Sequence, residues 1–269
     1  TQVVFSSNAN NLVVGDTNGT DDIFVKNLST GVVTRVSTDS SGAQGNSFTY
    51  SSKPVFSADG TQVAFYSDAS NLVADDTNGS YDVFVKNLST GEVTRVSTDS
   101  SGAQGNGSSD SPVFSADGTQ VAFTSEARNL VAGDTNGTTD VFVKNLSTGA
   151  VTLINTNSSG VQGNGGSGGP VFLPDGTQVA FESEANNLVA NDTNGATDIF
   201  VKNLITGAVT RVSTDSSGVQ GNGGSGTPVF SADGTQVAFH STASNLVAND
   251  TNGTYDIFVK NLSTGAVTR

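Results

Sequence analysis

The tripeptide Thr-Gln-Val recurs at residues 1, 61, 119, 177 and 235, and this spacing constrains the fold more than any other feature of the chain. The intervals are 60, 58, 58 and 58 residues, and the stretches between the copies are close to identical. A constant period of this kind is typical of a repeat architecture, in which each unit is one supersecondary element that packs on its neighbours. We therefore predict a single domain over residues 1–269, with repeat units that start at those five positions.

One unit contains four segments with strand character, namely 54–57, 61–65, 82–88 and 93–96. Asp59-Gly60 provides a tight turn between the first two, because glycine adopts the positive φ that hairpin turns need. The third segment is apolar on both faces, and no segment has helical periodicity over ten or more residues. Four short antiparallel strands with two apolar faces describe a propeller blade, whose sheet is covered on each side by another sheet.

The first-strand motif Pro-Val-Phe occurs four times, at 54, 112, 170 and 228, whereas the other strand motifs occur five times. We therefore predict an all-β, five-bladed propeller of four-stranded antiparallel blades, about 58 residues per repeat, with one blade lacking its first strand. Three explanations stay open: missing flanking sequence, a short first blade, or a strand from a neighbouring chain. The start at Thr1, without a basic and apolar leader, predicts a processed form or a fragment.

The composition disfavours several classes of partner. Acidic residues outnumber basic ones by 25 to 11, and the net charge of −14 disfavours nucleic acid and anionic membrane surfaces. The chain has no cysteine, so no disulfide or thiolate metal site can form. No run approaches the roughly 18 apolar residues of a membrane helix, so we predict no membrane insertion.

The motif Asp-x-Asn-Gly-x-x-Asp occurs once in each unit and holds two of the unit's acidic residues. Carboxylate and amide oxygens are the hard ligands that Ca²⁺ prefers, and the glycine allows the backbone to fold around an ion. The alternative is an Asx-type turn, in which the same side chains accept hydrogen bonds from backbone N–H groups. The candidate Ca²⁺ ligands are Asp16, Asn18, Asp22, Asp76, Asn78, Asp82, Asp134, Asn136, Asp140, Asp192, Asn194, Asp198, Asp250, Asn252 and Asp256.

Positions that differ between nearly identical units are candidates for recognition, with neutral drift at exposed sites as the alternative. The first set follows the second strand: Ser6, Tyr66, Thr124, Glu182 and His240. The second set precedes the last loop aspartate: Asp21, Tyr81, Thr139, Thr197 and Tyr255. The third set is the stretch before proline: Ser47–Lys53, Gly107–Ser111, Gly165–Gly169 and Gly223–Thr227.

Other polar residues give no catalytic pattern. His240 is the only histidine and has no Ser or Cys nucleophile near it in sequence, so we expect a surface residue. Glu182 and Glu184 form a carboxylate pair in one unit only. We expect the recurring lysines and arginines to be solvated or paired with aspartate; they are Lys26, Lys86, Lys144, Lys202, Lys260, Arg35, Arg95, Arg211 and Arg269.

The stretch Pro-Val-Phe-Ser-Ala-Asp-Gly-Thr-Gln-Val-Ala-Phe, with Asp-Val-Phe-Val-Lys-Asn-Leu-Ser-Thr-Gly after it, resembles the repeat of TolB-like bacterial β-propellers over the whole chain. Asn-Leu-Val-Ala-x-Asp-Thr-Asn-Gly-x-x-Asp and Ser-Ser-Gly-x-Gln-Gly-Asn are similar to a subgroup found in large secreted or surface bacterial proteins. The resemblance implies a propeller fold and an extracellular or cell-surface location, and propellers host many activities.

These features predict a non-enzymatic scaffold or adhesion module, extracellular or at the cell surface and stabilised by Ca²⁺. One alternative is a lectin-like propeller that binds a glycan or another ligand at one rim. Another is a self-assembling subunit of a surface fibre or array, joined through the incomplete blade. The expected partners are a protein or glycan at a propeller rim.

Overall fold

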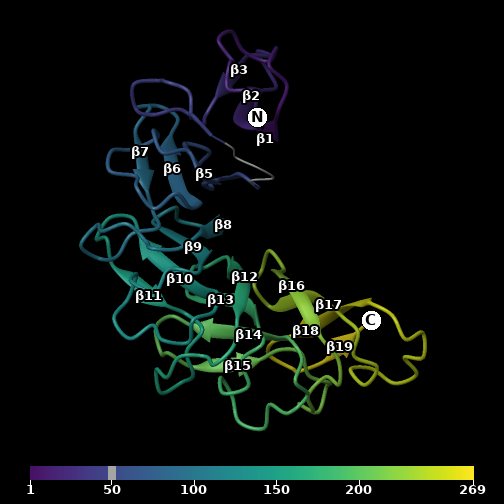
Figure 1. The fold of residues 1–269 in the computed structure, drawn as a ribbon. Helices are drawn as coiled ribbons and strands as arrows, with labels where there is room; N and C mark the ends of the chain where they lie inside the picture. Colours follow the sequence, from purple (N-terminus) through teal and green to yellow (C-terminus); the bar gives the residue numbers. More distant parts are fainter. Residues whose placement is uncertain (48–52) are drawn as a thin grey trace. The chain divides into compact units, whose positions relative to one another are not determined.

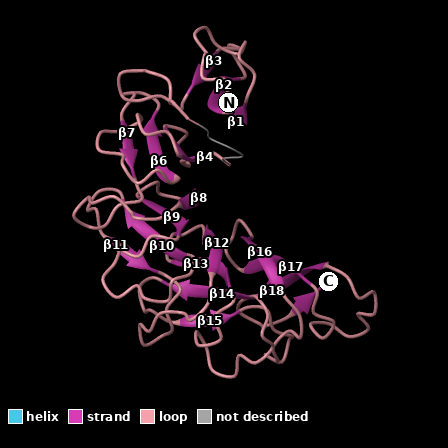
Figure 2. Cartoon of the chain, in the orientation of Figure 1, coloured by secondary structure: helices cyan, strands magenta, loops and turns pink. Residues whose placement is uncertain are grey.

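The structure is a computed structural model that describes residues 1–47 and 53–269, and the strands among them form five consecutive antiparallel sheets (Figures 1 and 2). The first sheet has three strands, β1 (Gln2–Ser7), β2 (Asp22–Asn27) and β3 (Val33–Arg35). The second comprises β4 (Val55–Phe56), β5 (Gln62–Ser67), β6 (Asp82–Asn87) and β7 (Val93–Arg95). The described residues contain no helix.

The remaining sheets repeat the same order of four strands. The third comprises β8 (Ser109–Phe114), β9 (Gln120–Ser125), β10 (Asp140–Asn145) and β11 (Val151–Leu153). The fourth comprises β12 (Ser167–Phe172), β13 (Gln178–Ser183), β14 (Asp198–Asn203) and β15 (Val209–Arg211). The fifth comprises β16 (Ser225–Phe230), β17 (Gln236–Ser241), β18 (Asp256–Asn261) and β19 (Val267–Thr268). The predicted five blades, with a first blade of three strands, are confirmed.

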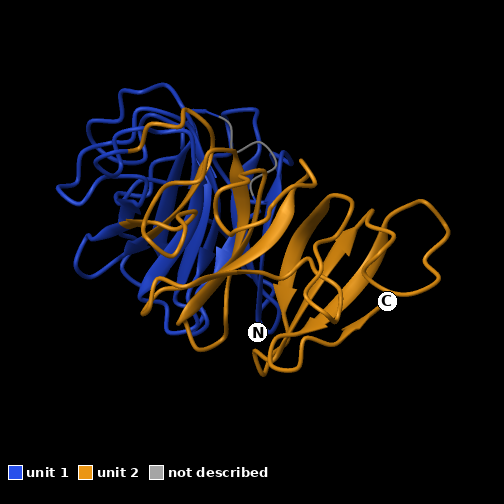
Figure 3. Ribbon diagram, turned by 90° about the horizontal axis from the view of Figure 1, so that it is seen from below, with its two compact units in different colours: residues 1–133, 144–151 blue, residues 134–143, 152–269 orange. Residues whose placement is uncertain are grey.

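The chain divides into two compact units (Figure 3). The first unit holds residues 1–133 and 144–151, and the second holds 134–143 and 152–269. The first and second sheets belong to the first unit, the fourth and fifth belong to the second, and residues of the third are in both.

Each blade is built on a pair of phenylalanines that face each other across its two middle strands. In the second blade Phe65 of β5 is opposite Phe84 of β6, and the ring centroids are 5.8 Å apart. Both side chains are fully buried. Burial of a phenylalanine contributes about 1.5–3 kcal/mol, so this pair stabilises the blade. The same facing pair recurs in the first, fourth and fifth blades, and Phe5 of the first blade is half-buried.

Packing between consecutive blades supplies the hydrophobic core. In the first unit Ile23 and Val25 of the first blade belong to one buried cluster with Val63, Phe65 and Leu72 of the second. The second unit repeats this arrangement: Ile199 and Val201 of the fourth blade cluster with Val237, Phe239 and Leu246 of the fifth. A sheet that is covered on both faces has no polar side, which is why its strands do not alternate apolar with polar residues.

The first strands of the third, fourth and fifth blades differ from the prediction, which started each of them at proline. Pro112 lies inside β8, between Ser109 and Phe114, where the register against β9 shifts between Asp110 and Val113. Such a bulge leaves a residue unpaired, so the missing N–H of proline costs no ladder hydrogen bond. The residues before proline therefore belong to the sheet, and they carry the third set of differing positions.

Candidate functional sites: acidic loops and differing residues

The acidic loops of the first four blades are each closed by the glutamine of the Gln-Gly-Asn connection that follows. In the second blade Gln104 Nε2 donates hydrogen bonds to Asp76 Oδ1 at 2.8 Å and to Asp82 Oδ2 at 2.7 Å. Gln44, Gln162 and Gln220 make the same pair of bonds in the first, third and fourth blades. The two aspartates of the motif are thus brought together in these four loops around a glutamine amide.

The orientation of the glutamine amide follows from its other contact. Gln104 Oε1 accepts a hydrogen bond from the backbone N–H of Thr77, so Nε2 must face the carboxylates. Asn78 is fixed in the same way, because its Oδ1 accepts from Ser80 N–H while its Nδ2 donates to the carbonyl of Gly105. The motif asparagine therefore forms the Asx-type turn that was the alternative to a metal ligand.

An arginine from the fourth strand brings positive charge to the same carboxylates. Arg95 Nη1 lies 3.5 Å from Asp76 Oδ1 and 3.7 Å from Asp82 Oδ2, and Arg211 pairs with the fourth loop in the same manner. Arg35 and Arg269 pair with aspartates of the first and fifth loops. The predicted pairing of arginine with aspartate is confirmed.

Burial dominates the electrostatics of the last loop aspartate. Desolvation raises the pKa of Asp82, and hydrogen bonds from Ser97 and Gln104 offset part of that rise. The pKa values of Asp22 and Asp198 are raised for the same reason. A carboxylate in this position needs donors on both oxygens, and the serine and glutamine provide them.

The third loop lacks its arginine. Leu153 occupies the position of Arg95, and Asn155 replaces Ser97 as a donor to Asp140. Asp134 and Asp140 are therefore bridged by the neutral amide of Gln162, without the guanidinium present in the other loops. Burial, with a contribution from the nearby Asp134 charge, raises the pKa of Asp140 to about 6.

Some contacts of the acidic loops oppose the predicted Ca²⁺ binding, and one unpaired carboxylate oxygen favours it. The Gln104 amide donates to both carboxylates and the Arg95 guanidinium lies at ion-pair distance from them, so an ion between them has to displace both side chains. Asp76 Oδ2, in contrast, is buried without a hydrogen-bond partner and is a free oxygen ligand. Within residues 1–47 and 53–269, no three acidic or histidine side chains gather around one point. Ca²⁺ binding stays a prediction, and the third loop is the one where no guanidinium competes.

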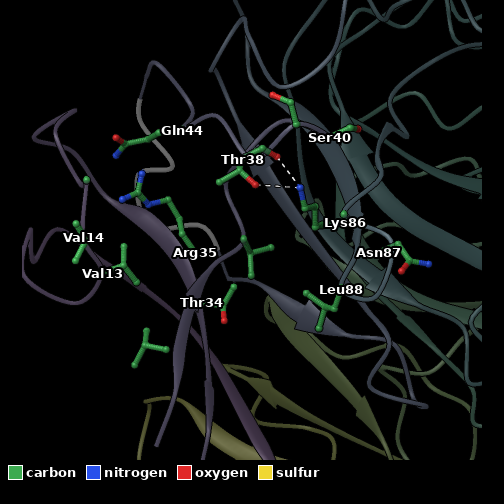
Figure 4. Close-up of a pocket in the computed structure, with 16 residues that line it drawn as sticks. Val13, Val14, Thr34, Arg35, Thr38, Ser40, Gln44, Lys86, Asn87 and Leu88 are labelled. Carbon is green, nitrogen blue, oxygen red and sulfur yellow. Dashed lines mark hydrogen bonds between the residues drawn. The ribbon is translucent and has the colours of Figure 1, made fainter.

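Four of the five recurring lysines are buried, which corrects the prediction of solvated or aspartate-paired side chains. Lys86 Nζ donates to the carbonyl and hydroxyl oxygens of Thr38 in the preceding blade, at 3.1 and 3.0 Å, and to the carbonyl of Asp39 at 2.8 Å (Figure 4). Lys144, Lys202 and Lys260 repeat these contacts. Lys26 is exposed. Burial lowers the pKa of Lys86.

The lysine contact lies beside an open cleft between the first and second blades. The cleft measures about 630 Å³, and Val13, Val14, Arg35 and Gln44 line it together with Lys86 (Figure 4). Its charged groups already have partners within the blades, because Arg35 pairs with Asp22 and Lys86 bonds to Thr38.

Asparagines of the repeat form a second link between blades. Asn71 Nδ2 donates to the carbonyl of Gln44, and Asn71 Oδ1 accepts from the backbone N–H of Asn46 at 2.9 Å. The same two bonds occur at the next three junctions, through Asn129, Asn187 and Asn245. Gly163 allows this approach at the junction of the third and fourth blades, because a Cβ there would lie 3.1 Å from Ala185 Cβ. These asparagines thus join consecutive blades.

The differing positions meet in pairs at one end of their sheets, where the second strand leaves and the third begins. In the second blade the rings of Tyr66 and Tyr81 are 5.7 Å apart and nearly perpendicular. In the fifth blade His240 and Tyr255 make the same edge-on contact at 5.2 Å. Thr124 of the third blade donates to Asp110 at 2.9 Å. The sequence found these positions, and the structure adds that members of different sets contact each other within these blades.

Two expectations from the sequence remain, the differing stretch before Pro54 and the pair of Glu182 and Glu184. The stretch Ser47–Lys53 falls almost entirely outside the described residues. Glu182 lies on β13 and is half-buried, whereas Glu184 follows that strand and is exposed. Glu182 accepts a hydrogen bond from Thr227 N–H in the next blade. This contact, which joins residues 45 positions apart, could not be deduced from the repeat pattern.

Comparison with known proteins identifies the fold of this chain. Protein-family models and curated protein sequences give no match. Among solved structures, TolB from Acinetobacter baumannii superposes with a TM-score of 0.52 and 22% identity, over 92% of this chain and 48% of that one. An oligogalacturonate lyase in complex with manganese gives 0.61 and 17%, over 99% of this chain and 61% of that one.

The chain has a TolB-like β-propeller fold. The β-propeller domain of the Trilobed protease from Pyrococcus furiosus also matches, with a TM-score of 0.52 and 9% identity over 91% of this chain and 62% of that one. The chain spans less than two thirds of the length of these three structures. Identities this low carry the fold and no activity.

Proposed function

We propose that this TolB-like propeller is a non-enzymatic scaffold, extracellular or at the cell surface, which recognises its partner through the residues that differ between repeats. One observation carries the proposal. The repeated polar side chains of the loops and junctions are used in contacts within and between blades, whereas the differing side chains gather at one end of the sheets. Binding residues are disproportionately found where loops leave a rigid scaffold, and the differing side chains lie at such a place.

The contacts of the acidic loops give no support to a catalytic role for their aspartates. A catalytic acid or base needs a free carboxylate or imidazole beside a reacting group, and the buried loop aspartates are held by glutamine, serine and arginine. The similar structures include a lyase and proteases, whose names describe those proteins. The extracellular setting is tied to the predicted Ca²⁺ loops, because weak calcium sites fill at the millimolar concentrations found outside cells.

The proposal is tested by a variant in which the differing positions are replaced by a residue that the same position has in another blade. We call it the levelled variant. It replaces Tyr66, Thr124, Glu182 and His240 by serine, the residue at Ser6, and Tyr81 and Tyr255 by threonine, the residue at Thr139. Binding of both proteins to a glycan array and to a surface-protein panel is then compared. We expect the wild type to bind one or more ligands and the levelled variant to lose them. Equal binding by the two proteins would refute the proposal.

A further inference from the structure

The half-buried side chains of Glu182 and His240 lie side by side over a glycine of the fifth blade. A Cβ on Gly226 would be 2.8 Å from Glu182 Oε2 and 2.9 Å from His240 Nε2. Gly226 is opposite His240 in the ladder between β16 and β17, so the imidazole leans over the strand that carries no side chain there. We call Glu182, Gly226, Thr227, His240 and Tyr255 the Glu182–His240 patch.

One oxygen of Glu182 is fixed by the backbone. Thr227 N–H donates to Glu182 Oε2 at 3.0 Å. Thr227 has a φ of +54°, an uncommon value for a β-branched residue, and such conformations persist only where the surroundings hold them. The hydrogen bond orients the carboxylate and leaves Glu182 Oε1 as an acceptor with no partner among the described residues.

In the third blade, the two residues at the positions of Gly226 and His240 form a hydrogen bond with each other. Asp110 takes the place of Gly226 and Thr124 that of His240, and the Thr124 hydroxyl donates to the Asp110 carboxylate at 2.9 Å. In the fifth blade the glycine cannot accept, so the imidazole has no hydrogen-bond partner within residues 53–269. Its described contact is the edge of Tyr255, whose side chain is 65% exposed.

We propose that the Glu182–His240 patch binds a neutral sugar, with one hydroxyl bridging Glu182 and His240 and the ring beside Tyr255. This inference rests on the proposed recognition function and names its ligand class. A sugar hydroxyl donates to a carboxylate and accepts from an imidazole N–H at the same time. The C–H face of a sugar packs on an aromatic ring. A Cβ on Gly224, two residues before Gly226, would meet nothing within 4 Å, so the backbone there is open to a ligand.

The spacing favours a hydroxyl over a metal ion. Glu182 and His240 form no ion pair with each other in the described part of the chain, so a space separates them. Two hydrogen bonds placed end to end span up to about 6 Å, which one hydroxyl bridges. A Zn²⁺ ion with bonds of about 2.0–2.2 Å requires its ligands to be drawn much closer together.

The single histidine provides the test. The Cε1–H resonance of His240 has no counterpart in the chain, so its chemical shift reports on the patch alone. Glucose, galactose, mannose, fucose and N-acetylglucosamine are titrated separately, with ZnCl₂ as a further titrant. We expect a saturable shift with at least one sugar, and an apparent affinity about tenfold weaker in Glu182→Gln, which turns the free acceptor into a donor.

Two further variants separate the outcomes. Gly226→Ala places a methyl group against both side chains and is expected to abolish the shift, whereas Glu92→Gln, at an exposed position of the second blade, is expected to leave it unchanged. Thermal melting checks that each variant folds. A shift caused by Zn²⁺ alone, no shift with any sugar, or equal affinity in Glu182→Gln overturns the sugar site. Array binding that is lost in the levelled variant but kept in Glu182→Gln overturns it while the recognition proposal survives.

Discussion

Gln104 donates a hydrogen bond to Asp82 at 2.7 Å across 22 residues of chain, and the same bond recurs in the first, third and fourth blades. It joins the polar connection after the fourth strand to the start of the third strand. Because Asp82 is fully buried, the bond satisfies a carboxylate that water does not reach. The acidic loop and the Gln-Gly-Asn connection are therefore two halves of one structural element.

Removal of this glutamine should destabilise the protein. Gln104→Ala leaves Asp76 and Asp82 without their shared donor, and we expect a loss of about 1–3 kcal/mol in the free energy of unfolding. Urea unfolding measures it, with the exposed Glu92→Gln of the same blade as the control. Equal unfolding midpoints for the two variants would contradict this role of the glutamine.

The third blade should be sensitive to pH. The pKa of Asp140 is about 6 in the folded chain, above its ordinary value of 3.8. The stability linked to this group is therefore fully present below pH 3.8 and is lost as the pH rises through 6. We expect Leu153→Arg to lower the pKa of Asp140 and to stabilise the protein more at pH 7.5 than at pH 4.5, by on the order of 1 kcal/mol in the difference, because Asp82 keeps a raised pKa even beside Arg95. Urea unfolding at the two pH values measures it, and Arg211→Leu should produce the opposite change.

The buried lysine should matter in four blades and not in the first. Lys86→Met keeps the apolar stem but removes the donor to Thr38 and Asp39, and we expect a cost of about 1–3 kcal/mol. Lys26→Met is a matched control, because the same repeat position is exposed there and we expect a change within about 0.5 kcal/mol. Similar losses in both variants would show that charge, and not the contact between blades, is responsible.

Ca²⁺ should raise the melting temperature relative to EDTA, because an ion that binds only the folded state stabilises it by mass action. We expect a Ca²⁺-specific rise in the wild type, with Mg²⁺ as the control. The rise should be smaller in Leu153→Arg, since the new guanidinium would compete for the third loop. The absence of any shift would assign all five loops to hydrogen-bonded turns.

The repeat period and the strand motifs were sufficient to predict the blades, because each unit has the same alternation and the same turns. The pairing of Arg95 with loop aspartates also followed from a repeated charge on a neighbouring strand. The limits of β8, β12 and β16 did not follow, because glycine-rich stretches before proline have little strand propensity of their own. Those residues become strands because the neighbouring strand provides hydrogen bonds.

Contacts between blades were beyond sequence reasoning. Lysine is usually exposed to solvent, so the sequence indicated an exposed Lys86. The side chain is buried because Thr38, 48 residues earlier in the chain, lies against it in the folded protein. Glu182 and His240 are likewise close only because the fourth and fifth blades pack against each other in the folded protein. The substitution of arginine by Leu153 was visible in the sequence, but its consequence for Asp140 required the loop geometry.

Calorimetric melting of the levelled variant beside Gln104→Ala tests the central claim most directly, since that claim assigns stability to repeated residues and recognition to differing ones. We predict that Gln104→Ala melts several degrees below the wild type, at about 2–4 °C per kcal/mol. The levelled variant, despite six substitutions, should melt closer to the wild type than Gln104→Ala does. A levelled variant that melts lower than Gln104→Ala would contradict the account, because the differing residues would then hold the blades together.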